Sequence, residues 1–393
     1  MHPWDELTAS HWQNHGSMKW TAFPGTLPGF VAEMDFPTAP VITEALHDMV
    51  DGELFGYLPP RWKSELKQAT AHFVQDQHGW SVPPSRIYPV ADVITAYDVV
   101  LQSLIPAGSP VIIPTPAYMP FFRITPFRGH PIVEVPMVTG DDAVPRMDLD
   151  AIDRAFEEGA RLLILCNPHN PLGRVYTRDE LESLAAVVSR HGGVVFSDEI
   201  HAPLRLGDAP HIPYASLNAE TAQHTVTAMS ASKAWNLPGL KCAQLVVTSD
   251  AHHAVLSPSE FMVSHGVANA GVVATIAAYR HGGPWLDDAL SYLRRNISFV
   301  TDELHRWLPE ARFHAPEGTY IAWIDLRSLD LGSHASPQAL LADEVKLSLT
   351  DGAQCGQAGV GHVRMICATP LPILKEMLER LHEAVTRHSG STD

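Results

Sequence analysis

Five short apolar runs, each followed by polar residues, recur between residues 109 and 249 of the chain. They read SPVIIPTP, RLLILCN, GGVVFSDEIH, HTVTAMS and CAQLVVTS. Unbroken apolar runs of this length are typical of strands buried on both faces of a sheet. Between two of them, TRDELESLAAVVSRHGG predicts a helix with a Thr177–Glu180 capping box and a glycine stop. Alternating strands and helices predict an α/β fold with a mostly parallel central sheet and helices on both faces.

The last third of the chain has a different pattern. A long amphipathic segment, WLDDALSYLRRNISFVTDELHRWLP, precedes two alternating strand candidates, TYIAWIDL and GHVRMIC, and a final helix. This α+β order predicts a smaller C-terminal domain over 285–393, after a large domain over 46–284. Residues 1–45 show little periodicity, and we expect them to form an arm that contributes to the small domain.

Charge and composition exclude several classes of function. The 393 residues are 45% hydrophobic, and their net charge of −17 argues against a nucleic-acid or anionic membrane surface. No apolar stretch is long enough to span a membrane, and the first residues lack a signal-peptide pattern. The four cysteines have no paired spacing, and the 22 histidines contain no HExxH pair. We therefore expect a cytoplasmic protein without disulfides or a metal site.

Polar residues that carry chemistry follow three of the apolar runs. Asn170 lies in NPHNPLG, Asp198 lies in SDEIH, and Lys233 lies in SASK. The carboxyl ends of parallel strands meet at one edge of a sheet, where open α/β folds bind ligands. We therefore expect these three side chains to converge on one pocket.

Each of these residues has a chemical use and a plain structural alternative. A desolvated lysine is nucleophilic near neutral pH and forms a Schiff base with an aldehyde, whereas most lysines are solvated. A buried aspartate either caps a loop or pairs with a cation, such as the protonated ring nitrogen of a cofactor. Asn170 also suits a plain turn. Ser230, Ser232 and Lys241 supply hydroxyl groups and charge for a phosphate.

Taken together, these motifs resemble the pyridoxal-phosphate (PLP) enzymes of the class I/II aminotransferase superfamily, which have fold type I. The residues that carry the resemblance are NPHNPLG, SDEIH and SASKAWNLPGLKCA. VAEMDFPTAPVITEAL, TPAYMPFF and SDEIHAPLRLGDAPHIPYASL are similar to the cystathionine β-lyase, or C–S lyase, branch. The resemblance covers nearly the whole chain, from residue 19 to residue 388.

The resemblance implies a role for each residue around the cofactor ring. Lys233 would bind the PLP aldehyde covalently, and Asp198 would pair with the pyridine nitrogen. Asn170 and His201 would face the phenolic oxygen, and Tyr118 would stack on the ring. Of these, Lys233, Asp198 and Tyr118 would be the catalytic residues.

The same resemblance implies a phosphate site. Ser230, Ser232 and Lys241 would hold the phosphate, together with the backbone of Asp92 and Val93 at the start of a helix, which is a favourable place for an anion.

Substrate binding and assembly follow from the resemblance as well. Arg364 would bind the substrate α-carboxylate, a task that suits the planar guanidinium group. Tyr57 would reach the phosphate and the substrate of a neighbouring subunit, which implies a homodimer with active sites at the subunit interface. The implied reaction is α,β-elimination of cystathionine or a cysteine S-conjugate to a thiol, pyruvate and ammonia.

Departures from the family pattern leave the substrate open. NPLG replaces the commoner NPTG, Lys241 stands where aminotransferases usually have arginine, and TDGAQCG lacks the usual Pro-Gly pattern. An aminotransferase of the same fold would use the same cofactor residues, and a lyase with an added regulatory binding role is a further alternative. SASK also fits the S-x-x-K of serine acyl-transferring enzymes, but the companion motifs S-D-N and K-T-G do not occur.

Overall fold

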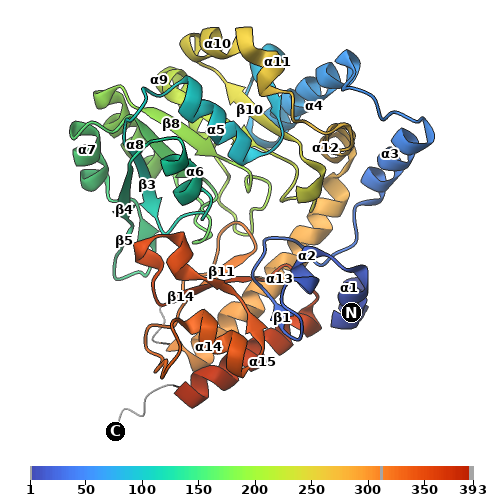
Figure 1. Ribbon diagram of the computed structural model, residues 1–393, viewed down its shortest axis with the longest axis vertical. Helices are drawn as coiled ribbons and strands as arrows, with labels where there is room; N and C mark the ends of the chain where they lie inside the picture. The colour runs from blue at the N-terminus through green and yellow to red at the C-terminus, as the bar shows by residue number, and fades with distance from the viewer. Residues whose placement is uncertain (1, 310–312, 389–393) are drawn as a thin grey trace.

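The computed structural model describes residues 2–309 and 313–388. Figure 1 shows a larger α/β part above a smaller part, which is built mainly from the orange and red C-terminal elements. The dark blue N-terminal segment lies beside the smaller part. In the described ranges, no helix combines the length and the apolar character needed to cross a membrane.

A seven-stranded sheet forms the centre of the larger part. In spatial order its strands are β2 (Ile87–Val90), β10 (Ala243–Val247), β9 (Thr225–Met229), β8 (Val194–Asp198), β7 (Leu162–Cys166), β3 (Val111–Thr115) and β4 (Ile132–Pro136). The strands from β9 to β4 are parallel, whereas β10 runs antiparallel to both of its neighbours. The predicted α/β class with a mostly parallel sheet is confirmed, and all five apolar runs are strands of this sheet.

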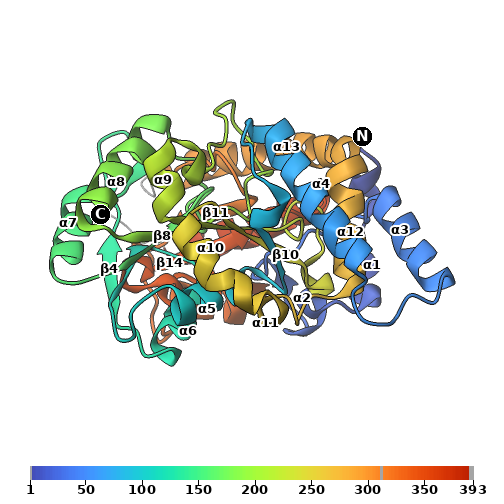
Figure 2. The same ribbon diagram turned by 90° about the horizontal axis from the view of Figure 1, so that it is seen from above.

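Successive side chains of a strand point to opposite sides of the sheet, and helices cover both sides. Ile113 and Ile164 belong to a core that α5 (Val93–Ser103) and α6 (Phe121–Phe127) cover. Their neighbours Ile112 and Leu163 belong to a second core on the opposite face. That face is covered by α7 (Leu149–Glu157) and α8 (Arg178–His191), and Figure 2 shows the helices on the two sides of the sheet.

Helix α8 has the predicted ends. The Thr177 hydroxyl accepts a hydrogen bond from the Glu180 backbone, and the Glu180 carboxylate accepts one from the Thr177 backbone. Gly192 ends the helix in the left-handed conformation with φ of 58°, which glycine adopts at little cost.

The other helices of the larger part complete its two outer layers. They are α3 (Pro40–Asp51), α4 (Pro60–His78), α9 (Ala219–His224), α10 (Asp250–Leu256), α11 (Glu260–Val263) and α12 (Asn269–His281). Helix α12 packs against both α3 and α4. A short hairpin of β5 (Val138–Thr139) and β6 (Pro145–Arg146) follows β4.

The smaller part has its own antiparallel sheet and core. The sheet consists of β11 (Ile321–Asp325), β14 (His362–Ile366) and β13 (Thr350–Asp351). The helices around it are α13 (Gly283–Trp307), α14 (Pro337–Glu344) and α15 (Leu371–His388). The long amphipathic segment is therefore one continuous helix, α13, of 25 residues.

The N-terminal segment joins the two parts of the molecule. After α1 (Ala9–His15) and α2 (Met18–Thr21), strand β1 (Leu27–Pro28) pairs in parallel with β12 (Leu347–Ser348) of the smaller part. The chain then crosses to the larger part, where the Asn236 side chain bonds both the amide and the carbonyl of Met34, at 2.9 and 2.8 Å. This path carries residues 30–33 past the carboxyl ends of the central strands.

Candidate active site

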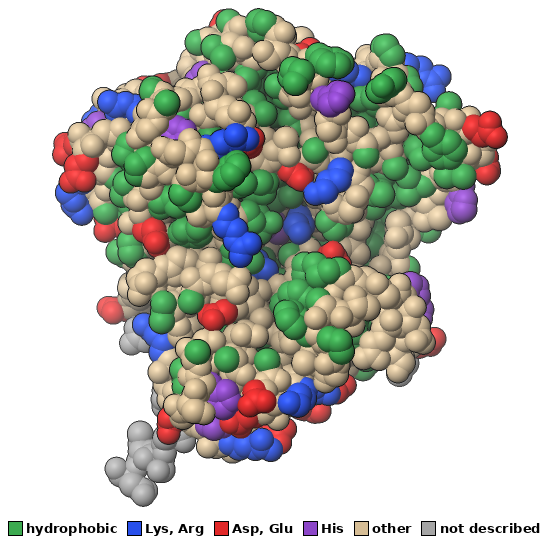
Figure 3. Space-filling model, viewed as in Figure 1, with side chains coloured by type: hydrophobic (Ala, Val, Ile, Leu, Met, Phe, Trp, Pro, Cys, Tyr) green, Lys and Arg blue, Asp and Glu red, His purple; other side chains and the backbone are tan. Residues whose placement is uncertain are grey.

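A cavity of about 630 Å³ lies between the two parts, at the carboxyl ends of β7, β8 and β9. Figure 3 shows a hollow in this region with blue Lys and Arg side chains around it. Residues predicted from the sequence to form the site line the cavity: Asp92, Val93, Tyr118, Asn170, Asp198, His201, Ser232, Lys233, Lys241 and Arg364. The tertiary structure thus brings together side chains that are up to 272 positions apart in the sequence.

Lys233 lies in the turn after β9 and extends into the cavity. Its Nζ donates a hydrogen bond to the backbone carbonyl of Ala32 at 2.9 Å. Burial lowers the pKa of Lys233 to about 8, and the charge of Arg364 acts in the same direction. A lysine in this state has a substantial neutral, nucleophilic fraction at physiological pH.

A fully buried lysine elsewhere in the chain shows why burial alone does not make a lysine reactive. Lys19 is 1% exposed, but its Nζ forms an ion pair with the Asp35 carboxylate at 2.6 Å. No carboxylate lies within ion-pair distance of Lys233 in the described part of the chain. Lys19 is therefore a structural ammonium group, whereas Lys233 has its nitrogen available for chemistry.

Asp198 is the last residue of β8 and is 2% exposed. One carboxylate oxygen accepts a hydrogen bond from the Ile200 backbone at 3.2 Å. Burial raises the pKa of Asp198 to about 7, because no cation of the described chain pairs with it closely enough to offset the loss of water. This carboxylate is suited to a cationic N–H group supplied by a ligand.

Arg364 on β14 is held from both parts of the molecule. Its guanidinium donates to the Asn170 side-chain oxygen at 3.2 Å, to the Phe30 carbonyl at 2.9 Å and to the Thr350 hydroxyl at 3.3 Å. Its Nε is buried and has no partner in the structure. A fixed, buried guanidinium with spare donors can bind a carboxylate.

The predicted anion site has a helix start at its centre. Helix α5 begins at Val93, and its N-cap Asp92 accepts a hydrogen bond from the Thr95 backbone at 2.7 Å. Lys241 lies against Asp92 at 2.9 Å, and Ser232 lines the same side of the cavity. Backbone N–H groups, a lysine and a hydroxyl together favour an anion.

Ser230 lies outside the cavity lining, although the sequence places it beside Ser232. Its hydroxyl donates to the Cys242 carbonyl at 2.7 Å and accepts from the Ser232 backbone at 3.0 Å. Ser230 is 3% exposed and, in this structure, shapes the turn that carries Lys233 instead of facing the cavity. Its predicted phosphate contact would require the hydroxyl to leave these partners.

His201 and Tyr118 both line the cavity, and burial shifts the pKa of each in the direction that keeps the side chain neutral. The Nδ1 of His201 is buried and has no hydrogen-bond partner among the described residues, and burial lowers the pKa of this residue to about 3. A neutral imidazole is therefore present at neutral pH. The Tyr118 ring packs edge-on against Phe121 with ring centres 5.7 Å apart, and its hydroxyl pKa is raised by burial.

Tyr57 lies away from the cavity of its own chain. Its side chain is 96% exposed and lines a separate, mainly apolar pocket with Phe55 and Phe261. A role at the active site of the same chain is therefore inconsistent with this position, and the predicted role at a neighbouring subunit needs a second copy.

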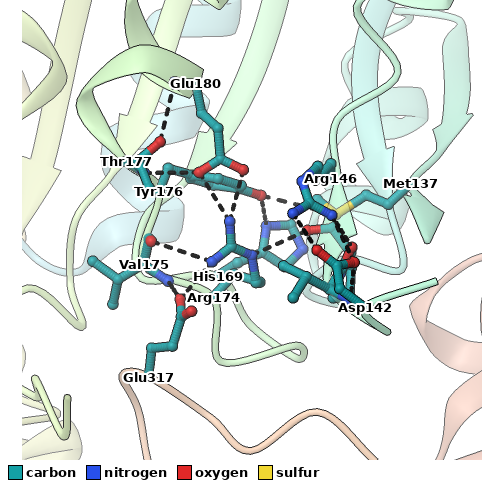
Figure 4. Close-up of polar contacts among 12 residues, drawn as sticks. Met137, Asp142, Arg146, His169, Arg174, Val175, Tyr176, Thr177, Glu180 and Glu317 are labelled. Atoms are coloured by element: carbon teal, nitrogen blue, oxygen red, sulfur yellow. Dashed lines mark hydrogen bonds and ion pairs between the residues drawn. The ribbon is translucent and has the colours of Figure 1, made fainter. Parts of the chain in front are cut away.

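The turn that presents Asn170 is fixed by a polar network, which Figure 4 shows. His169 contacts the Pro116 carbonyl at 2.8 Å and the Tyr176 hydroxyl at 3.0 Å. The buried Arg174 donates two bonds to Glu180, at 2.7 and 2.9 Å, and one to Glu317 at 2.6 Å. Glu317 precedes β11 of the smaller part, so this network also joins the two parts.

We expect the Arg174→Met variant to be less stable by about 3 kcal/mol, because it leaves two carboxylates without their cation beside a buried site. Urea unfolding of the purified protein measures the change. The Arg178→Met variant is the control, because the one ion pair of Arg178 within residues 2–309 and 313–388 is with the exposed Glu182 at 3.5 Å. Equal stability of the two variants would contradict a structural role of the network.

The N-terminal segment contributes contacts that the sequence did not reveal. The carbonyl oxygens of Phe30 and Ala32 bind Arg364 and Lys233, and Ala32 also accepts a hydrogen bond from Tyr320 at 3.1 Å. Backbone carbonyls have no side-chain signature, so only the path of the chain could identify them.

The family model for aminotransferase class I and II matches residues 31–381. The chain belongs to this family. Among known members, cystathionine beta-lyase PatB of Bacillus subtilis is 34% identical, and the match covers 92% of each chain. Cystathionine beta-lyase of Corynebacterium glutamicum is 33% identical, with 88% of this chain and 90% of the other covered.

A solved structure supports the same family assignment. Cystalysin from Treponema denticola, described as containing PLP, superposes with a TM-score of 0.90 at 27% identity. The superposition covers 98% of this chain and 100% of cystalysin. The family assignment from sequence motifs is confirmed.

Proposed function

We propose that this protein is a PLP-dependent carbon–sulfur lyase that releases a thiol, pyruvate and ammonia from sulfur amino acids. The observation that supports PLP binding is that Asp198 and Lys233 line one cavity and neither forms an ion pair in the described part of the chain, and the similarity to cystathionine beta-lyases favours the lyase reaction. A protonated pyridine nitrogen supplies the cation that Asp198 lacks, and an aldehyde supplies the partner for the Lys233 amine.

The remaining parts of the cavity fit PLP as well. The start of α5, with Ser232 and Lys241, suits the phosphate. The buried Nδ1 of His201, which has no partner among the described residues, suits the phenolic oxygen, and Asn170 lines the same cavity. When bound, PLP supplies an electron sink that stabilises negative charge at the substrate Cα.

The chain's own residues then orient the substrate and move the proton. Arg364 holds the α-carboxylate, which fixes the position of Cα relative to Lys233. The neutral Lys233 Nζ accepts the Cα proton, and its pKa of about 8 suits this role near neutral pH. The protonated Lys233 Nζ can then deliver a proton to the departing sulfur.

We further propose that the enzyme is a cytoplasmic homodimer. Each subunit would have a large domain over 46–284 and a small domain over 285–393. The four cysteines are buried and unpaired, as in a reducing compartment. The exposed apolar side chains of Phe55, Tyr57 and Phe261 favour a second copy as the cover of this surface. Sedimentation equilibrium tests the dimer, and a monomer at micromolar concentration would refute it.

Pyruvate release from cystathionine without a keto-acid acceptor tests the proposed function. We expect stoichiometric pyruvate, ammonia and thiol under these conditions. The alternative is an aminotransferase of the same fold, which would share the residues that bind PLP and remove the proton. An aminotransferase would stop after one turnover unless a keto acid is added.

A further inference from the structure

One part of the cavity lining is apolar and contains none of the residues assigned to the cofactor. Phe30 and Phe23 form an edge-to-face pair with ring centres 4.9 Å apart, and Met119 and Leu349 extend this apolar wall. Aromatic rings and thioethers are favourable neighbours for sulfur and short methylene chains. The wall therefore suits the S-substituent of a cysteine thioether.

Most charged groups of the cavity already have a partner or a role. Asp92 is paired with Lys241, Asp198 matches the pyridine nitrogen, and Arg364 matches the α-carboxylate. Lys233 provides the reacting amine. Arg123 also lines the cavity, and in the described part of the chain no carboxylate pairs with it.

The position of Arg123 is set by a firmly held helix. Phe121 and Thr125 of α6 are buried, and the Thr125 hydroxyl bonds to the Tyr97 hydroxyl at 2.5 Å. Arg123 lies between these two anchored residues on the exposed side of α6 and lines the cavity.

We propose that Arg123 binds a carboxylate on the departing thiol, so that the enzyme prefers cysteine thioethers whose S-substituent ends in a carboxylate. The inference rests on the proposed lyase function and specifies the substrate class of the same cavity. The apolar wall holds the sulfur and its methylene groups, and Gln338 and Gln354 offer further polar contacts beside them. Arginine suits this contact because its planar fork binds a carboxylate with two parallel bonds.

A matched pair of substrates isolates the charge. S-(2-carboxyethyl)cysteine and S-(2-carbamoylethyl)cysteine have nearly the same size and differ in the charge of the terminal group. We expect the wild-type protein to have the higher kcat/KM for the carboxylate. The Arg123→Gln variant should reduce the carboxylate-to-amide ratio of kcat/KM by about fivefold to tenfold, since the contact is charge-assisted but open to solvent.

Two further variants test whether the change in the kcat/KM ratio comes from the charge and geometry of the side chain at position 123. Arg123→Lys keeps the charge and should retain part of the preference, because lysine lacks the bidentate geometry. Arg128→Gln removes the same charge from the end of the same helix, where Arg128 pairs with Asp98 outside the cavity lining. This variant should leave the ratio unchanged. A wild-type protein without preference, or equal losses for both substrates in Arg123→Gln, would overturn the proposal.

A binding measurement separates this inference from the proposed reaction. In the PLP-loaded Lys233→Ala background, calorimetry should show tighter binding of the carboxylate than of the amide, and Arg123→Gln should remove the difference. If wild-type protein releases no pyruvate from either compound, the lyase function fails while the calorimetric comparison still decides the role of Arg123.

Discussion

Replacement of Lys233 by alanine is expected to abolish pyruvate release, with a loss of a thousand-fold or more (about 10³, within the ~10²–10⁴ range of a positioned general base). In the proposed mechanism Lys233 both attaches PLP and accepts the Cα proton, so its loss removes both functions. The buried Lys19 forms an ion pair with Asp35 and cannot replace Lys233. Steady-state assays with cystathionine and the visible absorbance of the PLP-loaded protein measure the two losses separately.

The Lys375→Ala variant is the control for the loss of a lysine, because Lys375 lies on the exposed side of α15. It should retain wild-type activity and absorbance. Pyruvate release by Lys233→Ala at more than a tenth of the wild-type rate would refute the assignment of Lys233 as the base.

The Asp198→Asn variant is expected to bind PLP but to lose about 10²- to 10³-fold in kcat, because a neutral amide does not stabilise a protonated pyridine nitrogen. The substitution is nearly isosteric, so the fold should be kept. Absorbance titration with PLP and steady-state kinetics measure the two effects. An unchanged kcat would show that Asp198 is only structural.

The same variant has an independent readout in the protein without PLP. Burial raises the pKa of Asp198 from 3.8 to about 7, so the folded state favours the protonated carboxyl. The stability of wild type relative to Asp198→Asn should therefore be highest near pH 4 and fall as pH rises to 7, by up to about 4 kcal/mol. Urea unfolding at pH 4, 5.5 and 7 tests the sign, and a relative stability that rises with pH would contradict an uncompensated buried carboxylate.

Local sequence patterns were sufficient for the elements of the central sheet and for the candidate residues that line the cavity. The apolar runs at β7, β8 and β9 identified strands buried on both faces, and the polar residues behind them identified the edge at which the cavity lies. The capping box of α8 was also correctly predicted from two residues, Thr177 and Glu180. These signals are local, because they depend on side-chain periodicity and on hydrogen bonds within one turn.

Partners in hydrogen bonding were harder to predict than residue types. Ser230 and Ser232 look equivalent in SASK, yet only Ser232 lines the cavity, since the Cys242 carbonyl of the next loop takes the Ser230 hydroxyl. Likewise, the carbonyls of Phe30 and Ala32 reach the site because β1 pairs with β12 and directs the arm across the cavity.

The sequence by itself determined the α/β class, the family and the identity of Lys233, Asp198 and Arg364 as candidates, because each depends on a short motif. Only the tertiary structure decided which charges are compensated. Lys19 is buried and Lys233 is partly buried, and the difference between a structural ion pair and an amine proposed to react is the carboxylate that folding places beside one and not the other. Charge compensation depends on distances between segments far apart in the chain, which no local pattern encodes.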